Sequence, residues 1–185
     1  RLDLQRFASA GALMPVALKD DAELEDYAWR VAGCVGEFWT KLGFLTMGER
    51  FSSSDENEMI RLGVNYGKGL QLINILRDLP ADLAQGRCYL PVENPADREQ
   101  LMACHRRWIE RADEWIGDGF RYASTLTTRR LQVASVMPAM IAKETLGLMK
   151  NASWDALKAG VKVPRIKVYA MLIKAFCGRA LRDEN

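Results

Sequence analysis

Four polar residues recur along one apolar segment at a spacing that favours metal and diphosphate chemistry. Gln71, Asn74, Asp78 and Asp82 follow one another at steps of three, four and four residues. Because an α-helix has about 3.6 residues per turn, these steps place all four side chains on one face. Leucine and isoleucine fill most of the remaining positions between 70 and 79, which predicts a buried helix with one polar stripe.

Paired aspartates in a buried helix point to a bound cation. An uncompensated carboxylate in a protein interior costs on the order of several kcal/mol, and a metal ion removes that cost. Mg²⁺ is commonly held by one or two carboxylates together with substrate phosphates. We therefore expect Asp78 and Asp82 to bind Mg²⁺ and a diphosphate group. The other expected contributors, two amides and two arginines, are Gln71, Asn74, Arg77 and Arg87.

The same carboxylates have a second interpretation that stays open. Asp78 and Asp82 would then lie on a solvated face or form ion pairs with neighbouring arginines. Pro80 lies between them, and a proline inside a helix removes one backbone hydrogen bond and clashes with the carbonyl four residues earlier. The helix therefore either kinks at Pro80 or ends and restarts there, which would change the direction of Asp82.

The elements that position these residues are predicted to be helices throughout. Acidic and hydroxyl residues precede two long apolar runs, as is typical of helix starts. The expected helical segments are Tyr27 to Leu45, 52 to about 83, Pro95 to Gly117 or Gly119, 127 to 150, 153 to 159 and the residues after Pro164. A loop is expected from Gly86 to Pro91, and no alternating strand pattern stands out. The chain is therefore predicted to be one all-α domain, residues 1–185.

Composition argues against several classes of function. Lys and Arg total 26 against 24 for Asp and Glu, so no strongly basic surface for nucleic acid is expected. The 4 cysteines form no CxxC pair and the chain has 1 histidine, which disfavours a zinc site. No signal peptide or membrane-spanning run stands out, which predicts a cytoplasmic protein. The chain begins with Arg1 instead of methionine, which predicts the interior of a longer protein.

Two motifs resemble a known family. The segment Gly69-Leu-Gln-Leu-Ile-Asn-Ile-Leu-Arg-Asp78, followed by Asp82 and by Gly86-Arg-Cys-Tyr-Leu-Pro91, is similar to the second signature of the squalene and phytoene synthases. Upstream, Tyr27-Ala-Trp-Arg-Val-Ala-Gly-Cys-Val-Gly36 resembles that family's Tyr-x-x-x-Val-Ala-Gly-x-Val-Gly helix. The resemblance implies an isoprenoid-synthase-type helical domain around a central cavity, incomplete at its N-terminus.

The resemblance also implies an activity. Enzymes of this family join two allylic prenyl diphosphates head to head through a cyclopropyl intermediate, and the expected reaction is farnesyl diphosphate to squalene. Mg²⁺ is the implied cofactor, with NADPH if the product is squalene; phytoene and dehydrosqualene form without NADPH. The expected partner is a prenyl diphosphate and not a nucleic acid.

Residue roles follow from the matched motifs. Asp78 and Asp82 would bind magnesium and act in catalysis together with Tyr27, which would lie near the reacting allylic cation. The remaining implied substrate contacts are Gln71, Asn74, Arg77, Arg87 and Tyr89 around the diphosphate, and Val31, Ala32 and Gly36 along the prenyl channel.

The chain departs from the family pattern in one respect. The family's first aspartate-rich helix should precede Tyr27, but no matching Asp-x-x-x-Asp is found there. An alternative function is therefore a non-catalytic or partner-dependent subunit that binds prenyl diphosphate, with a second chain supplying the missing helix. A late-helix tyrosine of the family is also replaced by Ala142.

Two further segments keep alternatives open. His105-Arg106-Arg107-Trp108 is either an anion-binding patch or an exposed helix face with Trp108 packed inward. The last helix carries basic residues around an apolar stripe, which suits either an anionic membrane surface or a core helix with a solvated basic face. Those basic residues are Lys162, Arg165, Lys167, Lys174, Arg179 and Arg182.

Overall fold

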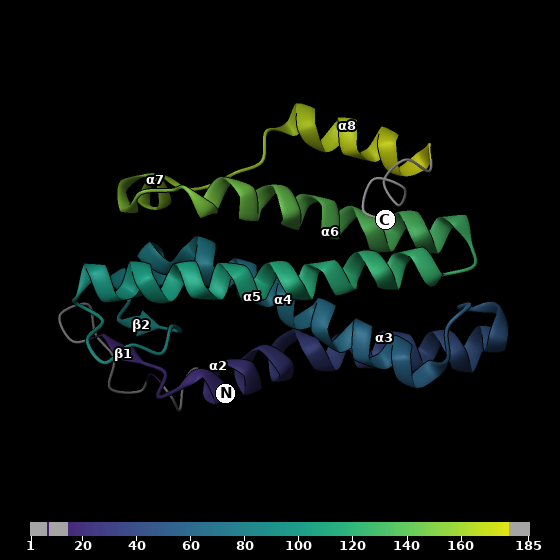
Figure 1. Cartoon of the computed structure of the whole chain (residues 1–185), viewed down its shortest axis with the longest axis horizontal. Helices are drawn as coiled ribbons and strands as arrows, with labels where there is room; N and C mark the ends of the chain where they lie inside the picture. Colours follow the sequence, from purple (N-terminus) through teal and green to yellow (C-terminus); the bar gives the residue numbers. More distant parts are fainter. Residues whose placement is uncertain (1–6, 8–14, 178–185) are drawn as a thin grey trace.

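The computed structural model describes residues 7 and 15–177, and these residues are almost entirely helical (Figure 1). Three long helices form its centre: α4 (Glu56–Ala84), α5 (Arg98–Thr125) and α6 (Arg129–Lys150). The helices α2 (Asp21–Ala28) and α3 (Cys34–Met47) lie along one side of this group, and α8 (Arg165–Phe176) lies on the other, against α6. The short helix α7 (Trp154–Ala159) connects α6 to α8. The predicted all-α fold class is confirmed.

Short polar side chains start several of these helices, as the sequence predicted. The carboxylate of Asp55 accepts the backbone N–H of Glu58 at 3.1 Å and begins α4. Asp97 does the same for α5, accepting the N–H groups of Glu99 and Gln100. Each cap satisfies backbone donors that have no partner inside the helix, which fixes where α4 and α5 begin.

The helix α5 is longer than predicted. Gly117 and Gly119 were expected to end it, but the helix continues to Thr125. A Cβ atom at Gly119 would lie 2.4 Å from Cδ2 of the Tyr66 ring on α4. The glycine therefore permits close contact between α4 and α5 and does not terminate the helix, so the prediction of its end was wrong.

The region between α2 and α3 contains a π-helical turn, η1 (Trp29–Gly33). The turn interrupts what the sequence predicted as one regular helix, and a 3₁₀ turn, η2 (Gly48–Arg50), follows α3. The backbones of η1 and α3 nearly touch that of α4: a Cβ on Gly36 would lie 2.0 Å from the carbonyl oxygen of Gly63. A Cβ on Gly67 would lie 2.3 Å from the carbonyl oxygen of Ala32. Only glycine fits at such a crossing.

A small parallel pair of strands links the start of the chain to the loop after α4. The strands β1 (Val16–Ala17) and β2 (Arg87–Cys88) pair with Val16 opposite Arg87, and the N–H of Val16 donates to the carbonyl of Gly86 at 2.9 Å. Strands of two residues are too short to show an alternating pattern, so they could not be recognised in the sequence. They hold the residues that follow Gly86 beside the end of α4.

The helices of the described residues are also too short or too polar for a bilayer. None of them combines the length and the apolar character needed to cross a membrane.

Candidate active site

The polar stripe of α4 lies on a partly open face. The helix remains continuous through Pro80 to Ala84, so it does not end and restart at the proline. The Asp78 side chain is 47% exposed and that of Asp82 is 18% exposed, one turn further along. Gln71 is half-buried and Asn74 is exposed. The expected common face is therefore present, but it is more accessible than the buried stripe that the sequence predicted.

Both aspartates form ion pairs with arginines. Arg77 donates from Nε and Nη2 to the two carboxylate oxygens of Asp78, at 2.8 and 2.7 Å. This hydrogen bonding raises the pKa of Arg77. Arg87, held beside α4 by β2, donates to Asp82 at 3.1 Å and to the side chain of Gln85 at 2.7 Å. The ion-pairing alternative is thus present in the structure, and it brings the predicted cations and carboxylates together.

Tyr27 and Tyr89 pack on each other behind this cluster. Both are buried, and their ring centroids lie 4.9 Å apart. Phe7 adds an edge contact to Tyr89, with centroids 5.1 Å apart. Tyr89 follows β2 directly, so the strand pair places this ring in the core while Arg87 reaches Asp82.

An apolar pocket of about 560 Å³ lies where α3, α4 and α6 meet. Its wall includes two of the three residues predicted for the prenyl channel, Ala32 and Gly36. The third, Val31, is 40% exposed and does not line this pocket, whereas Val35 does. The π-helical turn that contains Val31 changes the regular helical spacing by one residue, and the place of Val31 in a prenyl channel stays a prediction.

The hydroxyl groups at the edge of this apolar pocket already have partners. Tyr66 donates to the backbone carbonyl of Ser135 at 2.7 Å. Thr40 donates to the carbonyl of Gly36 at 2.8 Å, and its oxygen lies 3.1 Å from the hydroxyl of Tyr122. Burial raises the pKa of both tyrosines. The rings therefore face the pocket as neutral, largely apolar walls.

A second pocket, of about 520 Å³, contains Arg77 and Asp78. Its opposite wall carries Lys158 and Lys162, from α7 and the segment after it. The residue preceding each lysine is buried: Leu157 is 2% exposed and Val161 is 9% exposed. These apolar anchors fix the position of a segment whose lysines the sequence analysis did not assign to the site. An alternation of apolar and basic residues over 157–163 is the signal that could have indicated them.

The two pockets follow one another along the same pair of helices. On α4, Gly67 and Leu70 line the apolar pocket, and Arg77, Asp78 and Ala81 line the polar pocket. On α6, the corresponding lining residues are Ser135 and Pro138, then Ile141 and Thr145. An elongated ligand with one charged end would fit this order of apolar and polar surfaces.

The donor atoms on α4 suit a magnesium ion that is shared with a ligand. Among the described residues no group of three or more His, Cys, Asp or Glu side chains is arranged to hold a metal. Asp78 and Asp82 offer two carboxylates, which is the usual protein share of a Mg²⁺ site completed by phosphate oxygens and water. The residues present therefore fit a cation bound together with a diphosphate.

Comparison with known proteins identifies the family. The sequence model described as squalene/phytoene synthase matches residues 2–167. The chain belongs to the squalene/phytoene synthase family. It is 33% identical over 162 residues to presqualene diphosphate synthase of Zymomonas mobilis, which covers 83% of this chain and 51% of that protein. It is 34% identical over 117 residues to bifunctional lycopene cyclase/phytoene synthase of Neurospora crassa, covering 56% of this chain and 19% of that protein.

The fold comparison agrees. The solved complex of TcSQS with the ligand E5700 superposes with a TM-score of 0.75 at 20% sequence identity, over 91% of this chain and 53% of that one. At this identity the likeness concerns the fold alone, and it confirms the isoprenoid-synthase-type helical architecture. The chain spans about half the length of the Zymomonas mobilis relative and of the TcSQS chain.

Proposed function

We propose that this chain is the part of a head-to-head prenyl synthase that binds an allylic prenyl diphosphate. The observation that carries the proposal is the order of surfaces along α4. Leu70 lines an apolar pocket, while Asp78, farther along the same helix, lines a pocket bearing Arg77 and two lysines. The hydrocarbon chain would occupy the first pocket and the diphosphate the second.

Charge supports the placement of the diphosphate. The polar pocket is lined by Arg77, Lys158 and Lys162 against a single carboxylate, Asp78. Ionisation of an allylic diphosphate requires stabilisation of negative charge on the leaving group. Bound Mg²⁺, held by Asp78 and Asp82, would supply much of that stabilisation as a Lewis acid. Arg77, once released from Asp78, is placed to donate to phosphate oxygens, and the lysines add further positive charge.

The apolar pocket has a matching role. An allylic cation formed by ionisation is quenched by water, so it needs a surrounding from which water is excluded. The glycine contacts of Gly36 and Gly67 bring α3 and α4 together along one wall of the pocket. The rings of Tyr66 and Tyr122 form another part of the lining, and aromatic faces favour a nearby cation.

The complete reaction would require carboxylates in addition to those of α4. The described residues contribute the aspartate pair of α4, so we propose that the family's first aspartate-rich helix lies outside them in a working enzyme. On this view the chain binds prenyl diphosphate by itself and turns it over only with that helix. We further propose that the substrate is farnesyl diphosphate. The proposed product is squalene, whose formation uses NADPH.

The test is magnesium-dependent binding of a non-hydrolysable farnesyl diphosphate analogue, measured by calorimetry. Asp78→Asn should weaken binding by at least about a hundredfold, because it removes a direct metal ligand. Asp113→Asn is the matched control, since Asp113 also forms an ion pair, with Lys143, and its side chain is 44% exposed. Equal affinity with and without Mg²⁺, or no difference between the two variants, would contradict the proposal.

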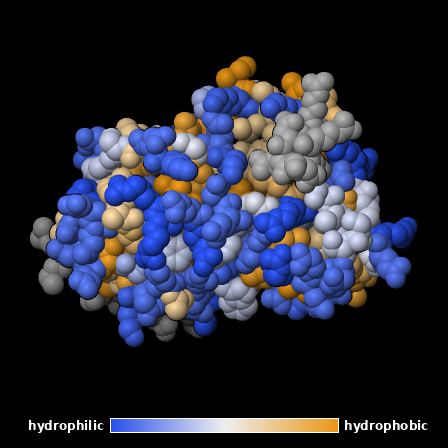
Figure 2. All heavy atoms as spheres, viewed as in Figure 1, coloured by the Kyte–Doolittle hydropathy of each residue, from blue (hydrophilic) through white to orange (hydrophobic). Residues whose placement is uncertain are grey.

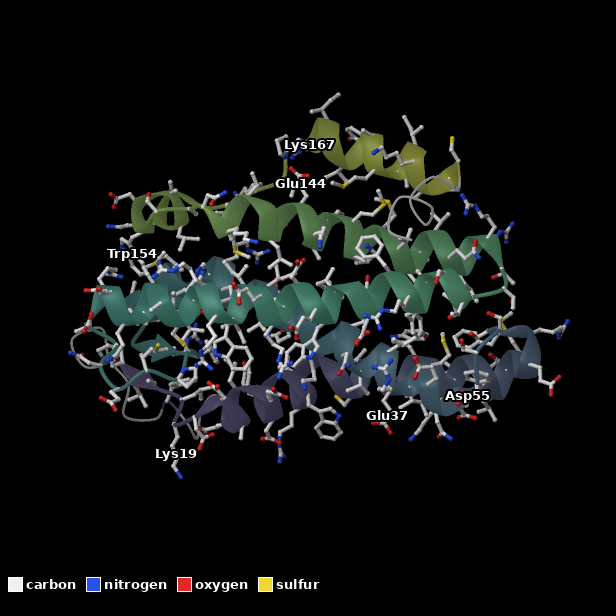
Figure 3. All side chains as sticks on the ribbon, in the orientation of Figure 1. Lys19, Glu37, Asp55, Glu144, Trp154 and Lys167 are labelled. Carbon is white, nitrogen blue, oxygen red and sulfur yellow. The ribbon has the colours of Figure 1, made fainter. Side chains whose placement is uncertain are left out.

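A specific observation on α8 favours a second property, contact with an anionic membrane. Figure 2 shows hydrophobic side chains along the outer edge of α8, and Ile166 is 75% exposed. Tyr169, Ile173 and Phe176 are also exposed on this helix, which contains no acidic residue. These four side chains are therefore not packed in the core of this chain, whereas Ala175 of the same helix is buried. Lys167 points toward Glu144 of α6 (Figure 3), and the predicted basic residues Arg179 and Arg182 lie outside the described residues.

Liposome flotation tests this membrane contact. The chain should float with anionic vesicles at low salt, and Ile166→Glu should abolish flotation. Leu45→Glu is the control, because Leu45 is 83% exposed but lies on α3. No flotation of the unmodified protein, or equal loss in both variants, would exclude α8 as the contact.

A further inference from the structure

The proline of the signature helix leaves one carbonyl without its helical donor. In an α-helix the N–H of residue 80 would bond to the carbonyl of residue 76, but Pro80 has no N–H. Leu76 is fully buried, so water does not take the place of that donor. A buried carbonyl without a partner is costly, and such groups are nearly always satisfied in folded proteins.

His105 of α5 supplies a donor at this point. Its Nε2 lies 3.2 Å from the carbonyl oxygen of Leu76. Because a carbonyl oxygen only accepts, Nε2 must carry the proton. The Nδ1 atom is buried and finds no partner among the described residues, so a proton on Nδ1 would be a buried donor without an acceptor. The expectation of an exposed face at His105 was wrong, since the residue is 0% exposed, whereas Trp108 is packed inward as predicted.

The position of this hydrogen bond matters for the proposed site. Leu76 and Pro80 lie on either side of Asp78, and Asp82 follows within the same helix. The helix would be expected to kink or stop at Pro80, yet it continues to Ala84. The turn between Leu76 and Pro80 is therefore held partly from outside α4.

We infer that His105 is a positioning residue for the Asp78–Asp82 pair. Its Nε2–H takes the place of the backbone donor that Pro80 lacks, and so keeps the two carboxylates on consecutive turns of one helix. The inference rests on the proposed function, because it assigns His105 a role in binding the diphosphate with its metal. A histidine that merely fills the core would have no specific relation to Pro80.

A double-mutant cycle separates these two roles. Pro80→Ala restores the N–H that reaches Leu76, and His105→Met removes the external donor while keeping an apolar side chain of comparable length. Binding of inorganic pyrophosphate in the presence of Mg²⁺ is measured for the wild type, both single variants and the double variant. His105→Met should weaken binding roughly tenfold in the wild-type background but less than about twofold in the Pro80→Ala background. An equal loss in both backgrounds would overturn the inference.

Two additional variants sharpen the cycle. His105→Gln retains a side-chain N–H donor and should bind within about threefold of the wild type. Tyr122→Phe removes a buried hydrogen-bonding group elsewhere on α5, the hydroxyl beside Thr40. Its effect on pyrophosphate binding should be the same in the wild-type and Pro80→Ala backgrounds. If Pro80→Ala restored binding to Tyr122→Phe as well as to His105→Met, the coupling would not be specific to His105 and Pro80.

Folding is followed by circular dichroism and urea unfolding. If His105→Met alone does not fold, recovery of the fold with Pro80→Ala is the supporting result, and continued failure to fold is the contrary one. Failure of the wild-type protein to bind pyrophosphate with Mg²⁺ would overturn the proposed function and the positioning role together. Normal wild-type binding without coupling between His105 and Pro80 would overturn the positioning role alone.

Discussion

The two pockets along α4 and α6 are built in opposite ways, and they are called here the apolar end and the polar end. At the apolar end, Gly36 and Gly63 bring two backbones into contact, and the tyrosine hydroxyls are already bonded. At the polar end, Asp78 forms a side-chain ion pair that is partly open to solvent, and Asp82 forms another one turn farther along α4. A backbone contact fixes a shape, whereas an ion pair can exchange partners. The comparison fits a ligand with an invariant hydrocarbon part and a charged part that replaces existing pairs.

This difference predicts where stability and binding depend on sequence. Overpacking at a rigid backbone contact has nowhere to relax, so it costs stability. Partly exposed ion pairs contribute little to folding, so their residues are free to serve binding. Substitutions at the two ends should therefore change different measurements.

The largest expected effect is at the apolar end. Gly36→Ala places a Cβ about 2.0 Å from the Gly63 carbonyl oxygen and should lower the free energy of unfolding by about 3 kcal/mol. Gly147→Ala is the matched control, because a Cβ on this helical glycine has no neighbour within 4 Å. It should raise stability by about 0.5–1 kcal/mol. Urea unfolding of both variants measures the contrast, and similar stabilities would show that the α3–α4 crossing is not rigid.

The next effect concerns binding at the polar end. Replacing Lys158 and Lys162 together with glutamine should weaken magnesium-dependent binding of the farnesyl diphosphate analogue roughly tenfold, because two positive charges leave the pocket wall. Stability should stay unchanged, since both side chains are exposed. Lys19→Gln is the control for the loss of a single lysine charge, at a lysine that points away from α4 and α7 (Figure 3). Calorimetry that finds equal affinity for all three proteins would remove the lysines from the site.

A smaller effect is expected on the pH dependence of the free energy of unfolding, through His105 beside the Leu76–Pro80 turn of α4. Burial lowers the pKa of His105 in the folded protein. Below about pH 6.5 the unfolded chain therefore binds a proton at this residue more readily than the folded protein does. Stability due to the neutral ring is thus complete above that pH and decreases as the pH falls, by at most about 1.4 kcal/mol per pH unit. His105→Gln should flatten this slope between pH 7.5 and 5.5 in urea unfolding. Parallel slopes for the two proteins would contradict the burial argument.

The smallest effect is expected at the ion pair itself. Arg77→Gln should change the free energy of unfolding by less than about 0.5 kcal/mol, because both partners are more than a third exposed. The same variant should weaken diphosphate binding if Arg77 donates to phosphate. A stability loss as large as that of Gly36→Ala would remove the distinction between the two ends.

Much of the site was predictable because it depends on local spacing within one helix. The common face of Asn74, Asp78 and Asp82 follows from the helical repeat, and the contacts of Ala32 and Gly36 follow from a recognisable motif. The continuation of α4 through Pro80 was left open by the sequence. The partner that satisfies the free carbonyl, His105, lies on another helix and cannot be located from spacing along α4.

Other features depend on tertiary packing. Val31 does not line the apolar pocket, and nothing in the sequence marks the π-helical turn that contains it. Gly119 was taken as a helix end because the ring of Tyr66, which requires it, is distant in sequence. Lys158 and Lys162 reach the polar pocket because buried Leu157 and Val161 anchor the chain on either side of Gly160, which has a positive φ. The positions of these residues are determined by tertiary contacts with residues that are distant in the sequence.

The π-helical turn also restricts the number of residues between Tyr27 and Gly36. It accommodates one extra residue in an otherwise continuous helix from Asp21 to Met47. Each helical residue advances the side-chain direction by about 100°. Deleting one residue within the turn would leave Gly36 against α4 but would rotate the preceding helix and carry Tyr27 away from the ring of Tyr89. A surface loop tolerates insertions and deletions, but at this turn they would disrupt the packing on one side. The number of residues here is therefore as constrained as their identity.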